Sequence, residues 1–155
     1  MSELAKYIDV VIANEEDAAD VFNIHSTKTD IVAGELNKEG YTIVIWDAYR
    51  PVEAQFKLWE ICPDARYVAN PYGGYSDHSR GNTLDISIAT LDGELAEMPS
   101  GFDEFSAVAD RNYYDVSSNA AEHARLLERF MYEAGFWGYN AEWWHYTDNQ
   151  SYSVI

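Results

Sequence analysis

The chain has 155 residues, 47% of them hydrophobic and 15% aromatic, which fits one folded domain with its own core rather than a disordered segment. Its formal net charge of −17 argues against nucleic acid and anionic membranes as partners, because both bind through clusters of Lys and Arg. A single cysteine, no apolar run long enough to cross a membrane and no secretory signal at the N-terminus together lead us to expect a cytoplasmic protein without disulfides.

The first forty residues predict a strand and two helices. Residues 7–13 have the composition of a strand, and Asn14 is a candidate N-cap for a helix over residues 14–20. Residues 30–39 have the apolar spacing of a helix, and Gly40 provides its C-terminal stop.

A strand and a helix follow. Residues 41–46 (Y-T-I-V-I-W) are β-branched and aromatic, which predicts a strand. Residues 51–61 predict a helix, since Pro51 suits the first turn and apolar residues recur at helical spacing. The expected apolar stripe consists of Val52, Phe56 and Trp59. After this helix, we expect Cys62 to be a small buried hydrophobic residue.

The next segments are mainly loop and strand. Residues 70–75 (N-P-Y-G-G-Y) predict a loop, and residues 83–89 alternate as a strand does. Residues 98–114 contain Pro99 and Gly101 and predict an irregular segment.

The last third predicts a long helix and a final strand. Ser118 or Asn119 can cap a helix that runs through Ala134 and stops at Gly135. Its apolar stripe is Ala121, Leu126, Leu127, Phe130 and Met131. The final strand covers residues 143–147. This order predicts a single α+β domain with a small, largely antiparallel central sheet flanked by helices.

Two short segments hold the residue types of a catalytic metal site. Residues 76–85 read S-D-H-S-R-G-N-T-L-D, and residues 142–146 read E-W-W-H-Y. Three N/O ligands leave a zinc ion one open position for water, and a carboxylate that does not bind the metal can move protons. The candidate ligands are His78, Asp85 and His145, with Glu142 as the acid/base.

Each half also has a structural interpretation. A buried Asp85 needs a partner, which either a metal or Arg80 can supply. The segment 142–146 can equally be an aromatic core strand with a hydrogen-bonded histidine. Strand residues three apart face opposite sides, so Glu142 and His145 share a site only if Glu142 lies at a bend, a bulge or the irregular start of the strand.

Arg50 ends the apolar strand and precedes Pro51, a typical place for a site residue. Its guanidinium can hold a developing oxyanion or a carboxylate through paired hydrogen bonds. The alternative is a surface salt bridge. No H-E-x-x-H, G-x-S-x-G, P-loop or C-x-x-C motif is present.

Together these motifs resemble the VanX-like D-alanyl-D-alanine dipeptidases, zinc peptidases that act on D-amino-acid dipeptides. The markers stand in the family's order between about residue 30 and about residue 147, as W-D-A-Y-R-P, S-D-H-S-R-G-N-T-L-D, F-D-E-F-S and E-W-W-H-Y. The segment before the arginine motif looks shorter than is usual in the family. We therefore expect an abbreviated N-terminal region over residues 1–29 and a catalytic core over residues 30–147.

The resemblance implies roles for the candidate residues. It implies one zinc ion per chain bound by His78, Asp85 and His145, with Glu142 as catalytic base and Arg50 stabilising the tetrahedral intermediate. It also implies that two further residues, Ser76 and Asp103, lie at the substrate amine. Tyr49 and Trp144 are expected to line the pocket.

The expected reaction is hydrolysis of the D-alanyl-D-alanine dipeptide to D-alanine. Two alternatives stay open at this point. One is a zinc carboxypeptidase or endopeptidase acting on peptidoglycan stem peptides, and the other is a zinc-binding module without catalysis. The expected partner is accordingly a small D-amino-acid dipeptide or a stem peptide.

Overall fold

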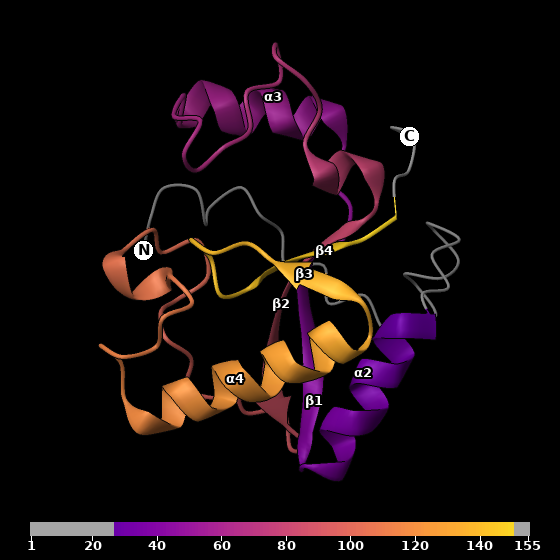
Figure 1. The fold of residues 1–155 in the computed structure, drawn as a ribbon. Helices are drawn as coiled ribbons and strands as arrows, with labels where there is room; N and C mark the ends of the chain where they lie inside the picture. The colour runs from indigo at the N-terminus through magenta and orange to yellow at the C-terminus, as the bar shows by residue number, and fades with distance from the viewer. Residues whose placement is uncertain (1–26, 151–155) are drawn as a thin grey trace.

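The computed structural model describes residues 27–150 (Figure 1). The strand predicted at residues 7–13 and the helix predicted at residues 14–20 lie outside this range. The described elements, in chain order, are α2 (Thr27–Lys38), β1 (Tyr41–Asp47), α3 (Val52–Ile61), η2 (Asp77–Arg80), β2 (Thr83–Thr90), η3 (Ala107–Ala109), α4 (Ser118–Glu133), β3 (Phe136–Gly138) and β4 (His145–Asp148). None of the helices in this range is long and apolar enough to cross a membrane.

The four described strands form one antiparallel sheet in the order β1-β2-β4-β3, which confirms the predicted α+β class. Helices α2 and α4 contact each other and the sheet, whereas α3 lies apart from them on the opposite side of the molecule (Figure 1). Strand β2 is central and buried along almost its whole length. Because its side chains alternate, Ile86 and Ile88 enter the core and Asp85 points to the other face.

The helices predicted within residues 27–150 are present with shifted ends. Helix α2 begins at Thr27, three residues earlier than expected, and Gly40 follows it at φ 88°. The N-cap of α4 is Ser117 rather than Ser118 or Asn119, because the Ser117 hydroxyl accepts a hydrogen bond from the Ala120 N–H at 3.1 Å.

The apolar stripe predicted for α4 is confirmed except at one position. Leu126 is half-buried, whereas the other four predicted residues are buried: Ala121, Leu127, Phe130 and Met131.

Helix α3 buries a polar residue in place of the predicted apolar stripe. Val52, Phe56 and Trp59 are only half-buried, and Gln55 is the one fully buried side chain of the helix. Cys62, expected to be buried, is half-buried and caps the helix through its N–H, which donates to the Leu58 carbonyl at 2.9 Å.

The C-terminal strands differ from the prediction in two ways. Strand β3 was not predicted, and β4 begins at His145, two residues later than expected. The delay has a local cause: the Trp143 N–H donates to the carbonyl of Ala109 at 2.9 Å instead of to a neighbouring strand. Residues 139–144 therefore form an irregular connection between β3 and β4.

Candidate metal centre

Three potential metal ligands from three elements converge at the end of β2. His78 comes from η2, Asp85 from β2 and His145 from the start of β4, and their ligand atoms all lie within 4.8 Å of one another. The His78 Nε2 lies 3.4 Å from Asp85 Oδ2, and the His145 Nδ1 lies 3.1 Å from Asp85 Oδ1. The structure thus brings together the three residues proposed as ligands.

Local hydrogen bonds place each ligand. Asp85 and His145 are direct partners across the β2–β4 ladder, so their side chains leave the same face of the sheet. The Ser76 hydroxyl accepts a hydrogen bond from the His78 N–H at 3.3 Å and starts η2. Gly81 ends η2 in the left-handed region at φ 69°, a conformation that favours glycine.

The donor set has the properties of a metal site. Within residues 27–150, the buried atoms Asp85 Oδ1 and His78 Nδ1 have no hydrogen-bond partner. Burial opposes the charge of Asp85, but the two histidines outweigh it and hold the pKa of this carboxyl below its usual range. A buried carboxylate oxygen without a hydrogen bond is costly unless a cation satisfies it. Two imidazoles and one carboxylate at these separations fit a zinc-type ion, whose ligands lie about 2.0–2.2 Å from the metal.

Glu142 lies in the irregular connection before β4. Because residues three apart in a regular strand face opposite sides, this position is what allows Glu142 and His145 to share a site. The Glu142 Oε2 is 3.5 Å from His145 Nδ1, and the residue is buried. Burial raises the pKa of the Glu142 carboxyl to about 7, with further contributions from the charges of Asp85 and Asp103, while His145 and Arg50 oppose the shift. A carboxyl with a pKa near neutrality can both accept and release a proton at physiological pH.

A β-bulge places Asp47 in the site, a role that the sequence analysis missed. Ile45 pairs with Ile86 and Asp47 pairs with Asp85, so Trp46 is an extra residue in β1. Without it, Asp47 would fall opposite Leu84 and face the core, because strand side chains alternate. With the bulge, the Asp47 carboxylate lies beside Asp85, and its Oδ1 is 3.7 Å from the His78 Nδ1.

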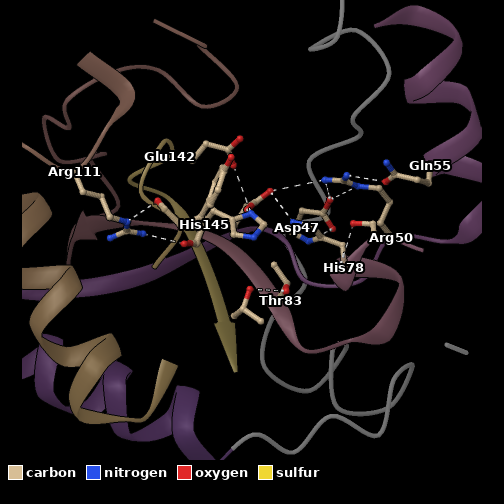
Figure 2. A network of polar contacts seen from close by, with 12 residues as sticks. Asp47, Arg50, Gln55, His78, Thr83, Arg111, Glu142 and His145 are labelled. Atoms are coloured by element: carbon tan, nitrogen blue, oxygen red, sulfur yellow. Dashed lines mark hydrogen bonds and ion pairs between the residues drawn. The ribbon is translucent and has the colours of Figure 1, made fainter. Parts of the chain in front are cut away.

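Arg50 is fixed by neighbouring side chains rather than exposed as a surface ion pair (Figure 2). Its Nε donates to Asp47 Oδ2 at 2.9 Å, and its Nη1 donates to Gln55 Oε1 at 3.0 Å. Gln55 in turn donates to the carbonyl of Ala69 at 2.7 Å. The second amino group of Arg50 lies 3.8 Å from Asp85 Oδ2. Burial opposes the charge of Arg50, but Asp47 and Asp85 outweigh it and raise the pKa of the guanidinium.

The four residues predicted to contact the substrate differ in their burial and in the side chains around them: Asp103, Ser76, Tyr49 and Trp144. Asp103 interacts electrostatically with Asp85 and Arg50, and burial together with Asp85 raises its carboxyl pKa to about 6. Ser76 is buried beside His78, and Tyr49 is half-buried next to Arg50 in the chain. Trp144 is fully buried and packs against the rings of two residues, Phe102 and Phe105.

Arg111 holds the backbone on both sides of Glu142, and no local motif in the sequence marks it. Its Nε donates to the carbonyl of Tyr139 and its Nη2 to that of His145, both at 2.9 Å (Figure 2). Its Nη1 also donates to the Tyr146 hydroxyl at 3.1 Å. A side chain at Gly138 would overlap the Arg111 guanidinium, so this glycine leaves the space that the arginine occupies.

Comparison with known proteins gives one consistent family. Residues 23–153 match the family described as D-Ala-D-Ala dipeptidase. The chain is 39% identical over 114 residues to the D-alanyl-D-alanine dipeptidase of Escherichia coli strain K12, covering 74% of this chain and 58% of that protein. It is 34% identical over 127 residues to the D-alanyl-D-alanine dipeptidase of Enterococcus faecium, covering 70% and 63%. The chain therefore spans about three fifths of the length of these relatives.

Proposed function

The chain belongs to the D-Ala-D-Ala dipeptidase family, and from this premise we propose that it is a zinc peptidase that hydrolyses the D-alanyl-D-alanine dipeptide to D-alanine. The observation that carries the proposal is the convergence of His78, Asp85 and His145 with the Glu142 carboxylate only 3.5 Å from one of them. The proposal includes one zinc ion per chain and a cytoplasmic location.

Glu142 is the proposed acid/base. His78, Asp85 and His145 would hold the zinc ion, which would make a bound water more acidic and polarise the scissile carbonyl. Glu142 takes a proton from the attacking water and passes it to the departing amine nitrogen. The water oxygen first bonds to the carbonyl carbon, with negative charge passing to the carbonyl oxygen. The C–N bond then breaks as the carbonyl re-forms, so each dipeptide and one water yield two D-alanine molecules. The raised pKa of Glu142, about 7, suits both proton steps.

Arg50 and Asp103 are the proposed charge partners of the substrate. Arg50 donates to the carbonyl oxygen as negative charge develops on it, and its bonds to Asp47 and Gln55 hold the guanidinium in place for this. Asp103, with Ser76, binds the free ammonium of the dipeptide. Tyr49 forms part of the wall, and Trp144 supports it from the core.

The decisive experiment compares two substrates on the zinc-loaded protein. D-Ala-D-Ala and a longer peptide ending in D-Ala-D-Ala are assayed side by side, with release of D-alanine as the signal. We expect cleavage of the dipeptide, abolished by a chelator and restored by zinc. Cleavage of the longer peptide alone would replace the dipeptidase proposal with a carboxypeptidase acting on stem peptides. Stoichiometric zinc without cleavage of either would favour the binding module.

A further inference from the structure

Trp143, the residue after the proposed base, is bonded at two points to one segment of the chain. Its backbone N–H donates to the Ala109 carbonyl at 2.9 Å, and its indole Nε1–H donates to the Ser100 hydroxyl at 3.0 Å. Ser100 and Ala109 lie on either side of Asp103 in the sequence. The segment that presents Asp103 is therefore bonded to the connection that presents Glu142.

The Ser100 hydroxyl takes part in two hydrogen bonds. It accepts one from the Trp143 indole and donates another to the Gly101 carbonyl at 3.1 Å. A hydroxyl whose hydrogen is directed to one partner presents its lone pairs to the other in a defined direction. Trp143 is fully buried, so loss of this acceptor would cost the indole N–H a bond that bulk water does not readily replace.

The turn that carries Asp103 is closely constrained. Asp103 has φ 54°, a left-handed conformation that is costly for a residue other than glycine. Glu104 closes the turn, because its N–H donates to the Gly101 carbonyl at 3.2 Å and its Oε2 accepts from the Gly101 N–H at 3.0 Å. The Phe102 ring packs on the Trp46 ring with centroids 4.5 Å apart. A turn held in this way passes a displacement at its start on to Asp103.

The distance between Asp103 and Glu142 matters for the proposed reaction. The two carboxyl groups interact electrostatically with each other, and both interact with Arg50 and Asp85. In a dipeptide, one residue separates the ammonium, which Asp103 binds, from the departing nitrogen, which Glu142 protonates. A misplacement of about 1 Å in such an arrangement can cost about 100-fold in rate.

We propose that Ser100 is a positioning residue, whose hydrogen bond to the Trp143 indole fixes the distance between Asp103 and Glu142. The inference rests on the proposed peptidase function, in which Asp103 and Glu142 contact the substrate and Ser100 acts through them. The bond joins residues 43 positions apart in the sequence. The backbone bond between Trp143 and Ala109 does not involve the Ser100 side chain, so the connection keeps its path when Ser100 is replaced.

Three substitutions at Ser100 separate the hydroxyl from the size of the side chain. Ser100→Ala and Ser100→Val remove the hydroxyl, whereas Ser100→Thr keeps it. Hydrolysis of D-Ala-D-Ala is measured per bound zinc. We expect kcat to fall by about 10- to 100-fold in the first two variants with KM within about threefold of the parent, because the ammonium still binds but the scissile bond is displaced from Glu142. Ser100→Thr should keep kcat within about threefold.

Two results of this assay would overturn the proposal. One is an equal kcat in Ser100→Val and Ser100→Thr, which would show that the hydroxyl has no influence on the reaction. The other is a change in KM alone, which would show that the bond supports substrate binding without aligning the scissile bond.

The partner of Ser100 is tested with Trp143→Phe, which removes the indole donor. Because the bond is already absent in this variant, adding Ser100→Ala should change kcat by less than about threefold. If Ser100→Ala lowered kcat as much in Trp143→Phe as in the parent, Ser100 would act independently of Trp143 and the proposal would fail.

Hydrogen exchange separates this inference from the peptidase function. The backbone N–H groups of Glu104 and Glu142 donate to the carbonyls of Gly101 and Tyr139, each at 3.2 Å, and report on the two segments. We expect both to exchange about 3- to 10-fold faster in Ser100→Ala than in Ser100→Thr, as measured by NMR. If the parent cleaves no dipeptide but both groups respond in this way, the peptidase proposal fails and the link between the segments stands. Unchanged exchange at Glu142 overturns the link, whatever the activity.

Discussion

The two sides of the metal centre are held in place by different means. On the Glu142 side, Arg111 donates to the backbone carbonyls of Tyr139 and His145 and fixes the connection between them. On the other side, Gln55 and Asp47 hold the guanidinium of Arg50 through side-chain contacts. The Glu142 side is therefore held through its backbone, and the Arg50 side through contacts between side chains.

The two ways of holding the side chains suit the proposed roles of Glu142, which exchanges a proton, and of Arg50, which keeps its charge. Glu142 is placed by backbone bonds. Among the described residues its carboxylate lies 3.5 Å from the Nδ1 of His145, and burial raises its pKa to about 7. Arg50 must stay charged, and its pairing with Asp47 and Asp85 favours the protonated form. The group that exchanges a proton is thus held indirectly, and the group that keeps its charge is held by ion pairs.

The sharpest test of this comparison is Glu142→Gln. We expect kcat to fall by about 100- to 10,000-fold, the usual contribution of acid/base catalysis, while zinc content stays stoichiometric. The amide keeps the size of the side chain, so packing should not change. Steady-state kinetics and metal analysis measure both quantities, with Glu122→Gln on the exposed side of α4 as the control. Loss of zinc from Glu142→Gln would make this residue a ligand and contradict its role as the base.

The hydrogen bonds from Arg111 to the carbonyls of Tyr139 and His145 form what we call the backbone clamp. The substitution Gly138→Ala tests it. The added Cβ overlaps the guanidinium of Arg111, so either the arginine or the 139–145 connection must move. We expect the free energy of unfolding to fall by about 2–4 kcal/mol from overpacking and lost hydrogen bonds, together with weaker zinc binding. Urea denaturation and zinc titration are the measurements.

A matched control for the clamp is Gly34→Ala in α2. A Cβ there meets nothing within 4 Å, so alanine should leave stability unchanged or raise it by up to about 1 kcal/mol. If Gly138→Ala were as stable as Gly34→Ala and bound zinc equally well, Arg111 would not be what holds the connection.

The charge-paired side is tested by Asp47→Asn. This change keeps the shape of the side chain but removes the charge that Arg50 and the second ring nitrogen of His78 face. We expect kcat/KM and zinc affinity each to fall by about 10- to 100-fold, as for other outer partners of metal-binding histidines. Asp92→Asn, in the exposed turn after β2, is the control. A drop in kcat with unchanged zinc affinity would limit Asp47 to the support of Arg50.

Much of the site follows from local features of the sequence. Gly81 and the Ser76 hydroxyl form the turn that presents His78, and glycine and serine are residue types that commonly end and cap a helix. The need for Glu142 to precede the strand follows from side-chain alternation alone, and β4 indeed begins after it, at His145.

Other features depend on contacts between distant segments. The bulge at Trp46 is defined by pairing with β2, so β1 read alone gives no reason for Asp47 to leave the core face. Arg111 reaches carbonyls 28 and 34 residues away, and no local pattern marks such a bond. Strand β3 has only three residues and ends in glycine, too short for a periodic signal. Ser117, Ser118 and Asn119 are all good caps, and only the path of the folded chain selects the first.

The smallest expected effect is a pH dependence of the metal-free protein. Burial raises the pKa of Glu142 to about 7 and that of Asp103 to about 6, so the folded protein binds these protons more tightly than the unfolded chain does. Stability should therefore fall as pH rises from about 4.5 to about 7 and level off above that. Asp85, whose pKa is lowered, acts in the opposite sense, but only as pH falls below about 4.

Glu142→Gln isolates the share of this dependence that belongs to the base. Its unfolding free energy, measured in urea with a chelator present, should vary less between pH 4.5 and pH 7.5 than that of the parent, by about 1–2 kcal/mol. Parallel curves for the two proteins would mean that Glu142 ionises as easily in the folded state as in the unfolded one. The backbone clamp would then have no bearing on the proton affinity of the base, and the contrast between the two sides of the site would lie in geometry alone.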